Sequence, residues 1–347
     1  MENIVTAIGT SNIALTKYWG KRDEKLILPT HSSISITLDE NLRAKTSLVF
    51  SKKIKTDTFY LNGKLQDLNE KEIGEKFQII DSIRRRAGVK EHVLVVSENN
   101  FPTATGLASS AAGMTALVYT AAKALDINLS TKELSMIVRR GSGSACRSVT
   151  GGFVRWNVGN RTDGEDSYAE QIADEKYWPE INDLIAIVSE AKKEVSSRSG
   201  MRQTVKTSKL YSMRPQLAEQ LTKELEEVIR SRDFERLAEI TMKDSNNLHA
   251  IMLDTYPPII YLNEGSKEII SAIHELNDSE GKPIAAYTFD AGPNAHIITL
   301  DKYKSTVRKR LEEMKSIIRV IESKAGPGPR LLRKDESLID EDTLSPR

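Results

Sequence analysis

The stretch from Pro102 to Gly113, Pro-Thr-Ala-Thr-Gly-Leu-Ala-Ser-Ser-Ala-Ala-Gly, constrains the fold more than any other part of the chain. An apolar run at residues 93–96 predicts a strand before it, and an Ala-rich segment with apolar residues at helical spacing predicts a helix after it. A loop of small residues lets a phosphate approach the helix start, where free N–H groups and the positive dipole end favour an anion. The loop matches neither the Walker pattern nor the dinucleotide G-x-G-x-x-G pattern. The alternative is a helix whose small residues let a neighbouring element pack closely.

The composition of the 347-residue chain excludes several classes of protein. The 50 Lys and Arg residues balance 49 Asp and Glu residues, and a net charge of +1 gives no field that recruits nucleic acid or a membrane. The single cysteine excludes an internal disulfide framework, and the five histidines show no metal-ligand spacing. No apolar run reaches membrane-spanning length and the N-terminus lacks a signal-peptide core, so a soluble cytoplasmic protein is expected.

The length and the periodicity of the chain predict two domains of mixed helices and strands. A buried strand is expected at residues 184–188, which places the boundary near residue 183. Elsewhere the pattern predicts strands within residues 3–10, 33–50, 283–289 and 296–300, and helices at 70–88, 215–231, 233–252 and 302–321. Ser130 and Glu133 form a predicted capping box. The charged segment 326–347 is expected to be disordered.

Four further stretches carry residues suited to binding anions or moving protons. Residues 17–23 hold two lysines with Tyr and Trp between them, and residues 139–148 combine glycines, hydroxyls and arginines. Residues 192–202 form a second cluster of hydroxyls and cations, and Asp290 lies on a Gly-Pro turn between two predicted strands. Plain structural interpretations remain open for these stretches: a solvated charged loop, a helix-to-strand turn and a turn-capping Asp. Cys146 is expected to be a small buried residue.

Together these segments resemble the mevalonate diphosphate decarboxylases, which belong to the GHMP small-molecule kinase superfamily. The resemblance runs from about Asn12 to Leu300 and rests on five motifs in the family's order. They are Lys17-Tyr-Trp-Gly-Lys-Arg-Asp with Leu28-Pro-Thr, Gly106-Leu-Ala-Ser-Ser-Ala-Ala-Gly, Arg140-Gly-Ser-Gly-Ser-Ala-Cys-Arg-Ser, Val195-Ser-Ser-Arg-Ser-Gly-Met, and Thr288-Phe-Asp-Ala-Gly-Pro-Asn. Gly9-Thr10-Ser11, Thr105 and Val149-Thr150 depart from the family pattern, but none of them removes a catalytic group.

The resemblance implies a reaction and a fold. The reaction is ATP-dependent decarboxylation of mevalonate 5-diphosphate to isopentenyl diphosphate, ADP, phosphate and CO₂, through phosphorylation of the C3 hydroxyl, in the mevalonate pathway of isoprenoid biosynthesis. The implied fold is α+β and GHMP-kinase-like. It has an S5-like N-terminal domain at 1–183 with the ATP phosphate loop, a ferredoxin-like C-terminal domain at 184–325, and the active site between them. ATP and Mg²⁺ are the implied cofactors, and the implied assembly is a homodimer.

The resemblance also assigns roles to individual residues. Asp290 accepts a proton from the C3 hydroxyl or orients it, Lys17 holds Asp290 ionised, and Arg147 grips the substrate carboxylate. The implied substrate-binding residues are Tyr18, Trp19, Gly20, Lys21, Lys76, Ser142, Gly143, Ser144, Ala145, Cys146, Arg147, Ser197 and Arg198. The implied ATP-binding residues are Gly106, Leu107, Ala108, Ser109, Ser110, Ala111 and Gly113. Mg²⁺ is expected mainly on the ATP phosphates, with Ser109 or Ser110 as a further ligand.

Two alternatives remain open. An enzyme of the same fold could act on mevalonate 5-phosphate, or phosphorylate mevalonate at C3 without decarboxylating it. A nucleotide-binding paralogue without catalysis is the alternative from another class. Lys21, Ser144, Ser197 and Arg198 argue for a diphosphate, and the intact catalytic positions argue for turnover.

Overall fold

The computed structural model describes residues 2–101, 109–191 and 193–347, apart from the side chains of Glu72 and Lys76. Its α-helices are α1 (Lys71–Ala87), α2 (Ser109–Ala124), α3 (Thr131–Gly141), α4 (Ser197–Thr207), α5 (Arg214–Ser231), α6 (Phe234–Leu253), α7 (Glu264–Ser279) and α8 (Asp301–Glu312). The predicted capping box begins α3, where the Ser130 side chain accepts a hydrogen bond from the backbone N–H of Glu133. None of the helices in these ranges is both long enough and apolar enough to cross a membrane.

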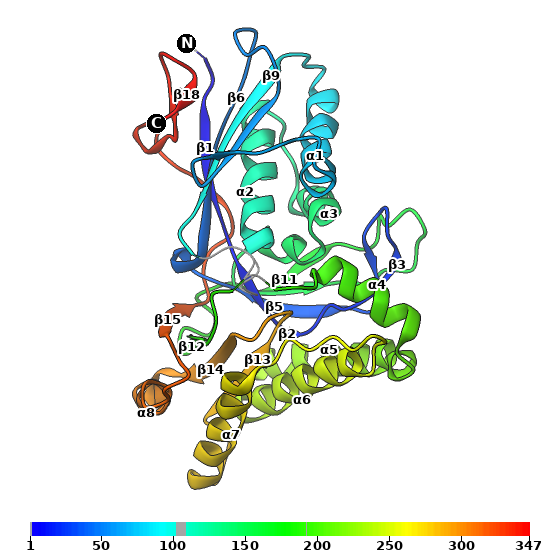
Figure 1. Ribbon diagram of the computed structural model, residues 1–347, viewed down its shortest axis with the longest axis vertical. Helices are drawn as coiled ribbons and strands as arrows, with labels where there is room; N and C mark the ends of the chain where they lie inside the picture. The colour runs from blue at the N-terminus through cyan, green and yellow to red at the C-terminus, as the bar shows by residue number, and fades with distance from the viewer. Residues whose placement is uncertain (1, 102–108, 192) are drawn as a thin grey trace.

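A six-stranded sheet forms the N-terminal part of the molecule, with α1, α2 and α3 on one face (Figure 1). Val93 and Val95 pack against these helices, whereas Leu94 and Val96 point to the opposite face, as the period of two along a strand requires. The strands, in spatial order, are β16 (Arg330–Leu331), β1 (Val5–Thr10), β6 (Arg43–Ser51), β9 (His92–Asn99), β7 (Thr58–Leu61) and β8 (Lys64–Leu65).

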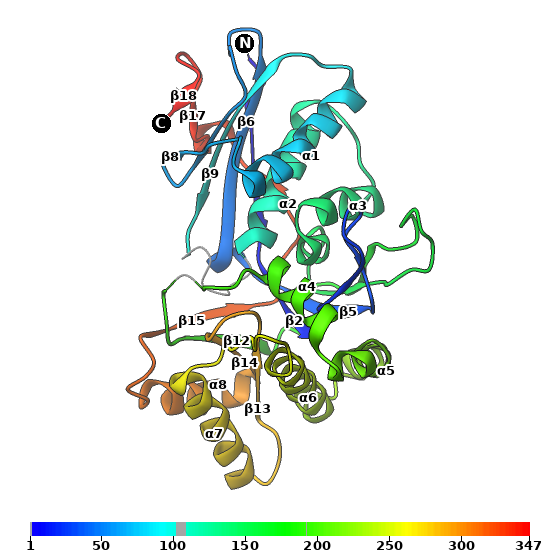
Figure 2. The same ribbon diagram turned by 45° about the vertical axis from the view of Figure 1, so that its right-hand side comes forward.

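Two four-stranded sheets form most of the rest of the molecule (Figure 2). One continuous hydrophobic core connects them. In spatial order the first contains β11 (Ala169–Ala173), β10 (Phe153–Trp156), β5 (Ser33–Thr37) and β2 (Asn12–Thr16), and α5 and α6 pack on it. The second contains β13 (Ala285–Phe289), β14 (Ala295–Leu300), β12 (Ile181–Ile187) and β15 (Arg319–Lys324). A short ribbon of β3 (Lys21–Asp23) and β4 (Leu28–Pro29) projects beside them. The predicted α+β class is confirmed, while the proposed boundary after residue 183 falls inside β12.

The expectation of a disordered segment at 326–347 is wrong. Strand β16 pairs antiparallel with β1, and a small hairpin of β17 (Ile339–Asp340) and β18 (Ser345–Pro346) follows. Leu338 and Ile339 are buried against Val49 and Leu94, on the sheet face that α1–α3 leave open. The segment is mostly charged, so its composition predicted disorder. Burial of the two apolar side chains Leu338 and Ile339 nevertheless stabilises the packing of this segment on the first sheet.

The helix expected at 302–321 is also shorter than predicted. Helix α8 ends at Glu312, and residues 319–324 form strand β15, which pairs antiparallel with β12. The run Ile317-Ile318-Arg319-Val320-Ile321 is rich in β-branched residues, which favour strands where a sheet edge is available.

We predict that Ile339→Ser lowers the free energy of unfolding by about 2–4 kcal/mol, because it leaves a cavity and buries a hydroxyl under the first sheet. The matched control is Leu331→Ser, since Leu331 lies in the same C-terminal segment but is 47% exposed. Urea denaturation of both variants measures the difference. Equal stability of the two variants would contradict the packing role of the C-terminal segment.

Candidate active site

A cavity of about 650 Å³ lies where the first sheet, its helices and the C-terminal half meet. Most of the predicted site residues line it, although they come from segments far apart in the sequence. These are Tyr18, Trp19, Lys21, Ser109, Ser110, Gly113, Ser142, Gly143, Ser144, Ser197, Arg198 and Asp290.

An ion pair joins the ends of two strands at this cavity. The Lys17 ammonium, after β2, lies 2.6 Å from a carboxylate oxygen of Asp290, which follows β13. Burial by itself raises the pKa of Asp290, but the charge and hydrogen bond of Lys17 bring that pKa below its usual value. Burial lowers the pKa of Lys17, and Asp290 opposes that shift. The pair therefore keeps the Asp290 carboxylate ionised at the cavity, where its side chain is 27% exposed, as a proton acceptor requires.

The backbone of Lys17 is held by a second ion pair that the sequence analysis missed. Asp244 on α6 accepts a hydrogen bond from the Lys17 N–H at 2.6 Å, and Arg214 at the start of α5 donates to the Lys17 carbonyl at 3.0 Å. The two side chains also bind each other, and both are fully buried. No local sequence signal identifies them, because they lie about two hundred residues from Lys17 along the chain.

The segment after α3 places Arg147 behind the cavity wall. Residues Gly143–Ser148 form a 3-10 helix in which Ala145, Cys146 and Arg147 are buried. The Arg147 guanidinium donates to Ser33 Oγ at 2.7 Å and to Asn12 Oδ1 at 3.3 Å, and its Nε has no partner among the described residues. Burial raises the pKa of Cys146 to about 12, so the thiol is neutral. Neither Ala145 nor Cys146 lines the cavity as the structure describes it, and Cys146 is the small buried residue expected from the sequence.

A row of hydroxyls connects the start of α2 with the segment after α3. Ser110 Oγ lies 3.2 Å from Ser142 Oγ, which in turn lies 3.4 Å from Ser144 Oγ. A Cβ added at Gly113 would meet no atom of the described residues within 4 Å, so α2 is open to the cavity at this position as far as those residues show. The free N–H groups of a helix start and these hydroxyls suit the phosphates of a nucleotide. Three positions of the predicted ATP loop, Gly106, Leu107 and Ala108, lie outside the described residues.

Cations surround the other side of the cavity. Lys21 and Arg198 line it together with Ser197, which begins α4 behind the N-cap Ser196. Tyr18 also lines it, and its hydroxyl has no hydrogen-bond partner among the described residues. Burial raises the pKa of Tyr18, so its neutral phenol can donate a hydrogen bond. The side chain of Lys76, another predicted contact, lies outside the described part of α1.

Lys193 is a cavity residue to which the sequence analysis gave no role. Its ammonium donates to Ser197 Oγ at 2.9 Å and to the carbonyl of Ala291 at 3.2 Å, directly after Asp290. A second ammonium thus lies near the ion pair, where it can offset negative charge on a reacting group. Lys193 belongs to the cluster of cations at 192–202 that the sequence shows, but only the fold brings this lysine close to Asp290.

The far end of the cavity is apolar, and the sequence analysis did not predict it. Phe59 and Leu61 of β7, Phe77 of α1 and Leu117 of α2 line this end. Asn99 at the end of β9 lies among them, and its side-chain oxygen is buried without a partner among the described residues. Apolar side chains beside an unpartnered amide oxygen suit a nucleobase that carries an amino group.

Gly20, which was expected to bind substrate, does not line the cavity in the described structure, and its role there is structural. Its φ is +106°, and an added Cβ would lie 1.7 Å from the hydroxyl of Tyr211, which accepts or donates a hydrogen bond with Thr30 at 2.7 Å. Only glycine therefore allows the turn between β2 and β3 to pack on Tyr211.

We predict that Gly20→Ala lowers the free energy of unfolding by about 1–3 kcal/mol more than Gly88→Ala does. Gly88 also has a positive φ, of +68°, but a Cβ added there meets no atom of the described residues within 4 Å, so the control places Ala at a positive φ without the collision. Thermal denaturation of both variants measures the difference. A Gly20→Ala protein no less stable than the control would show that Tyr211 moves aside freely.

Among the described residues, no group of three or more His, Cys, Asp or Glu side chains is arranged to hold a metal ion. The oxygen donors at the cavity that suit Mg²⁺ include the hydroxyls of Ser109 and Ser110 and the carboxylates of Glu194 and Asp290. This donor set fits an ion that takes most of its other ligands from phosphate oxygens and water.

Comparison with known proteins identifies the family. Residues 9–169 match the diphosphomevalonate decarboxylase-like N-terminal domain, and residues 183–318 match the mevalonate 5-diphosphate decarboxylase C-terminal domain. The diphosphomevalonate decarboxylase of Danio rerio is 47% identical over 86% of this chain and 77% of its own length. The crystal structure of mevalonate diphosphate decarboxylase from Staphylococcus aureus superimposes with a TM-score of 0.88 at 35% identity, covering 96% of this chain and 99% of that chain.

A third match is a structure described as MDDEF in complex with MVAPP, AMPPCP and magnesium. It superimposes with a TM-score of 0.86 at 37% identity, covering 96% of this chain and 99% of that chain. The matches extend across both halves of the molecule, so the fold of both halves is shared. The chain belongs to the diphosphomevalonate decarboxylase family.

Proposed function

We infer that this chain catalyses the ATP-dependent decarboxylation of mevalonate 5-diphosphate to isopentenyl diphosphate, ADP, phosphate and CO₂. The observation that carries this inference is the ion pair of the buried Lys17 with Asp290 at a cavity lined by groups suited to binding phosphate. Identity of 41–47% to curated diphosphomevalonate decarboxylases over most of the chain supports it.

We propose that Asp290 accepts the proton of the C3 hydroxyl as that oxygen attacks the γ-phosphorus of ATP. Lys17 keeps Asp290 ionised, and Lys193 offsets negative charge on the transferring phosphoryl group. The C3–oxygen bond then breaks with loss of phosphate, and the electrons of the breaking carbon–carboxylate bond form the alkene as CO₂ leaves. Arg147 would bind the substrate carboxylate, with its Nε–H, which has no partner among the described residues, as the available donor.

Separate groups at the cavity suit the two substrates, mevalonate 5-diphosphate and ATP. Tyr18, Lys21, Ser144, Ser197 and Arg198 would hold the substrate diphosphate, and the start of α2 would hold the ATP phosphates. Mg²⁺, when bound, supplies charge neutralisation between the phosphates of ATP, and Ser109 or Ser110 would add a hydroxyl ligand. The MDDEF structure with AMPPCP and magnesium supports both cofactors for the family.

We assign the apolar end of the cavity to the adenine ring, with the Asn99 oxygen accepting from its amino group. We predict that Asn99→Leu raises the KM for ATP about tenfold, because a buried hydrogen bond is lost, and leaves the KM for mevalonate 5-diphosphate unchanged. Steady-state kinetics with each substrate varied in turn measures both constants. A rise in the KM for mevalonate 5-diphosphate alone would place the nucleobase elsewhere.

The reaction is tested by incubating the protein with ATP, Mg²⁺ and, separately, mevalonate, its 5-phosphate and its 5-diphosphate, while ADP and CO₂ are followed together. Equal release of ADP and CO₂ from the diphosphate alone is the expected result. ADP without CO₂ would indicate a 3-kinase, and turnover of the monophosphate alone would indicate the neighbouring decarboxylase. No turnover with any of the three would leave a nucleotide-binding protein.

We further propose a homodimer in the cytoplasm. Met213, Tyr256 and Ile260 are each about 70–80% exposed, and Leu210 and Tyr256 lie where the segment 208–213 meets the end of α6. Exposed apolar side chains of this size are typical of protein interfaces. Sedimentation of the wild type and of Tyr256→Glu tests the assembly, and cell fractionation tests the location.

A further inference from the structure

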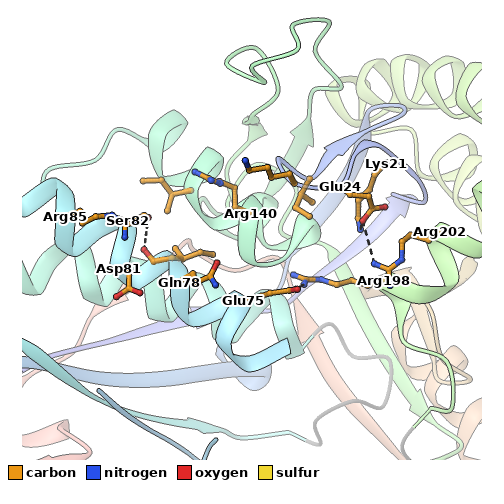
Figure 3. A pocket seen from close by; sticks show the side chains of 14 residues that line it. Lys21, Glu24, Glu75, Gln78, Asp81, Ser82, Arg85, Arg140, Arg198 and Arg202 are labelled. Carbon is orange, nitrogen blue, oxygen red and sulfur yellow. Dashed lines mark hydrogen bonds and ion pairs between the residues drawn. The ribbon is translucent and has the colours of Figure 1, made fainter. Parts of the chain in front are cut away.

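A second cavity of about 770 Å³ lies beside the active-site cavity, and the proposed reaction does not require it (Figure 3). Its walls are α1, α3, the turn between β3 and β4, and α4. Lys21, Ile27 and Arg198 line both this cavity and the active-site cavity, so the two spaces meet at the cations assigned to the substrate diphosphate.

The second cavity carries an excess of positive charge. Its six cations are Lys21, Lys25, Arg85, Arg140, Arg198 and Arg202, against the three carboxylates of Glu24, Glu75 and Asp81. Lys25, Arg85 and Arg140 have no ion-pair partner within residues 2–101, 109–191 and 193–347. Figure 3 shows Arg85 toward one end and Arg202 toward the other, with Arg140 between them. A hollow with an excess of positive charge concentrates anions and speeds their arrival.

The cations shared by the two cavities are already paired with carboxylates. Lys21 lies 2.8 Å from Glu24, and Arg198 lies 3.0 Å from Glu75. The side chain of Lys21 is only 2% exposed, whereas that of Glu24 is 49% exposed. The Arg198 pair is arranged the same way, with a more buried cation and a more exposed carboxylate. A buried ammonium without a counter-ion is costly, so these carboxylates satisfy the cations until another anion arrives.

We propose that the second cavity is the entrance for the diphosphate group of the substrate, and that Glu24 and Glu75 hold Lys21 and Arg198 until the diphosphate displaces them. This inference rests on the proposed function, in which Lys21 and Arg198 bind the substrate diphosphate. Each carboxylate is about half exposed and can turn into water, and the arriving diphosphate then supplies the negative charge that the more buried cation needs. The unpaired arginines then attract the substrate along the groove, and the paired cations receive it.

The proposal predicts opposite effects on substrate binding for the paired carboxylates and for the unpaired arginines. Glu24→Gln and Glu75→Gln should each tighten binding of mevalonate 5-diphosphate about two- to fivefold, because the diphosphate then no longer has to displace a carboxylate from the cation; the gain is small because each carboxylate is about half exposed and weakly held. Arg85→Gln and Arg140→Gln should slow association and flatten its dependence on salt. If the carboxylates only hold the cations in place, their removal should weaken binding instead.

The test is titration calorimetry of mevalonate 5-diphosphate without ATP, together with stopped-flow association at several salt concentrations. Glu264→Gln is the matched control, because this glutamate also pairs with a lysine three residues away but lies on α7 and is 85% exposed. Thermal denaturation confirms that each variant is folded. Tighter binding by both glutamate variants, with Glu264→Gln unchanged, is the expected result.

Lys21→Met distinguishes a failure of the displacement proposal from a failure of the proposed diphosphate site. Weaker substrate binding by Lys21→Met, with unchanged or weaker binding by Glu24→Gln and Glu75→Gln, would overturn the displacement proposal and leave the diphosphate site intact. Unchanged binding of mevalonate 5-diphosphate by Lys21→Met would show that Lys21 does not bind the substrate diphosphate, and would contradict the proposed diphosphate site. Association rates and salt dependence unaffected by Arg85→Gln and Arg140→Gln would show that the substrate enters by another route.

Discussion

Replacing Asp290 by Asn should lower kcat for both ADP and CO₂ release by about a thousandfold or more. The amide keeps the shape of the side chain but cannot accept the C3 hydroxyl proton, and it leaves the buried Lys17 ammonium without its counter-ion. Because phosphorylation precedes loss of CO₂ in the proposed sequence, both products should fall together. A coupled assay for ADP and release of labelled CO₂ measure the two rates.

The matched control for this change is Asp278→Asn, an exposed aspartate at the end of α7. Far-ultraviolet circular dichroism and thermal denaturation separate loss of chemistry from loss of fold. An Asp290→Asn enzyme that still forms ADP at the wild-type rate but releases no CO₂ would move Asp290 from proton transfer to the decarboxylation step.

Replacing Lys17 by Met should lower kcat by about a hundredfold or more and change how activity depends on pH. In the wild type, Lys17 keeps the pKa of Asp290 below its usual value of 3.8, so activity that needs the ionised carboxylate is lost only as the pH falls through that low value. Without Lys17, burial raises the pKa of Asp290, and the acidic limb of the profile should move to higher pH. The profile of kcat/KM against pH measures the shift.

Lys267→Met, at an exposed position on α7, controls for the loss of a lysine. A purely structural role for Lys17 would lower activity equally at every pH. An acidic limb at the same pH in Lys17→Met and wild type would therefore show that this lysine does not set the charge of Asp290.

The sequence by itself determined the local parts of this protein. The Ala-rich α2 and its capping-box neighbour α3 follow from periodicity and from Ser130 and Glu133, which depend only on residues a few positions apart. The clusters at 17–23, 139–148 and 192–202 could be recognised as anion-binding because arginine, lysine and small hydroxyls occur together in short spans. The charge state of such groups, however, depends on neighbours that the sequence does not place beside them.

The tertiary structure alone decided the rest, because its contacts join residues hundreds of positions apart. Periodicity could not show that Leu338 and Ile339 cover the open face of the first sheet, or that residues 319–324 become a strand on β12. It could not show that Asp244 and Arg214 hold the backbone of Lys17. Burial and the charge of a distant side chain together set the pKa of Asp290, and both exist only once the chain is folded.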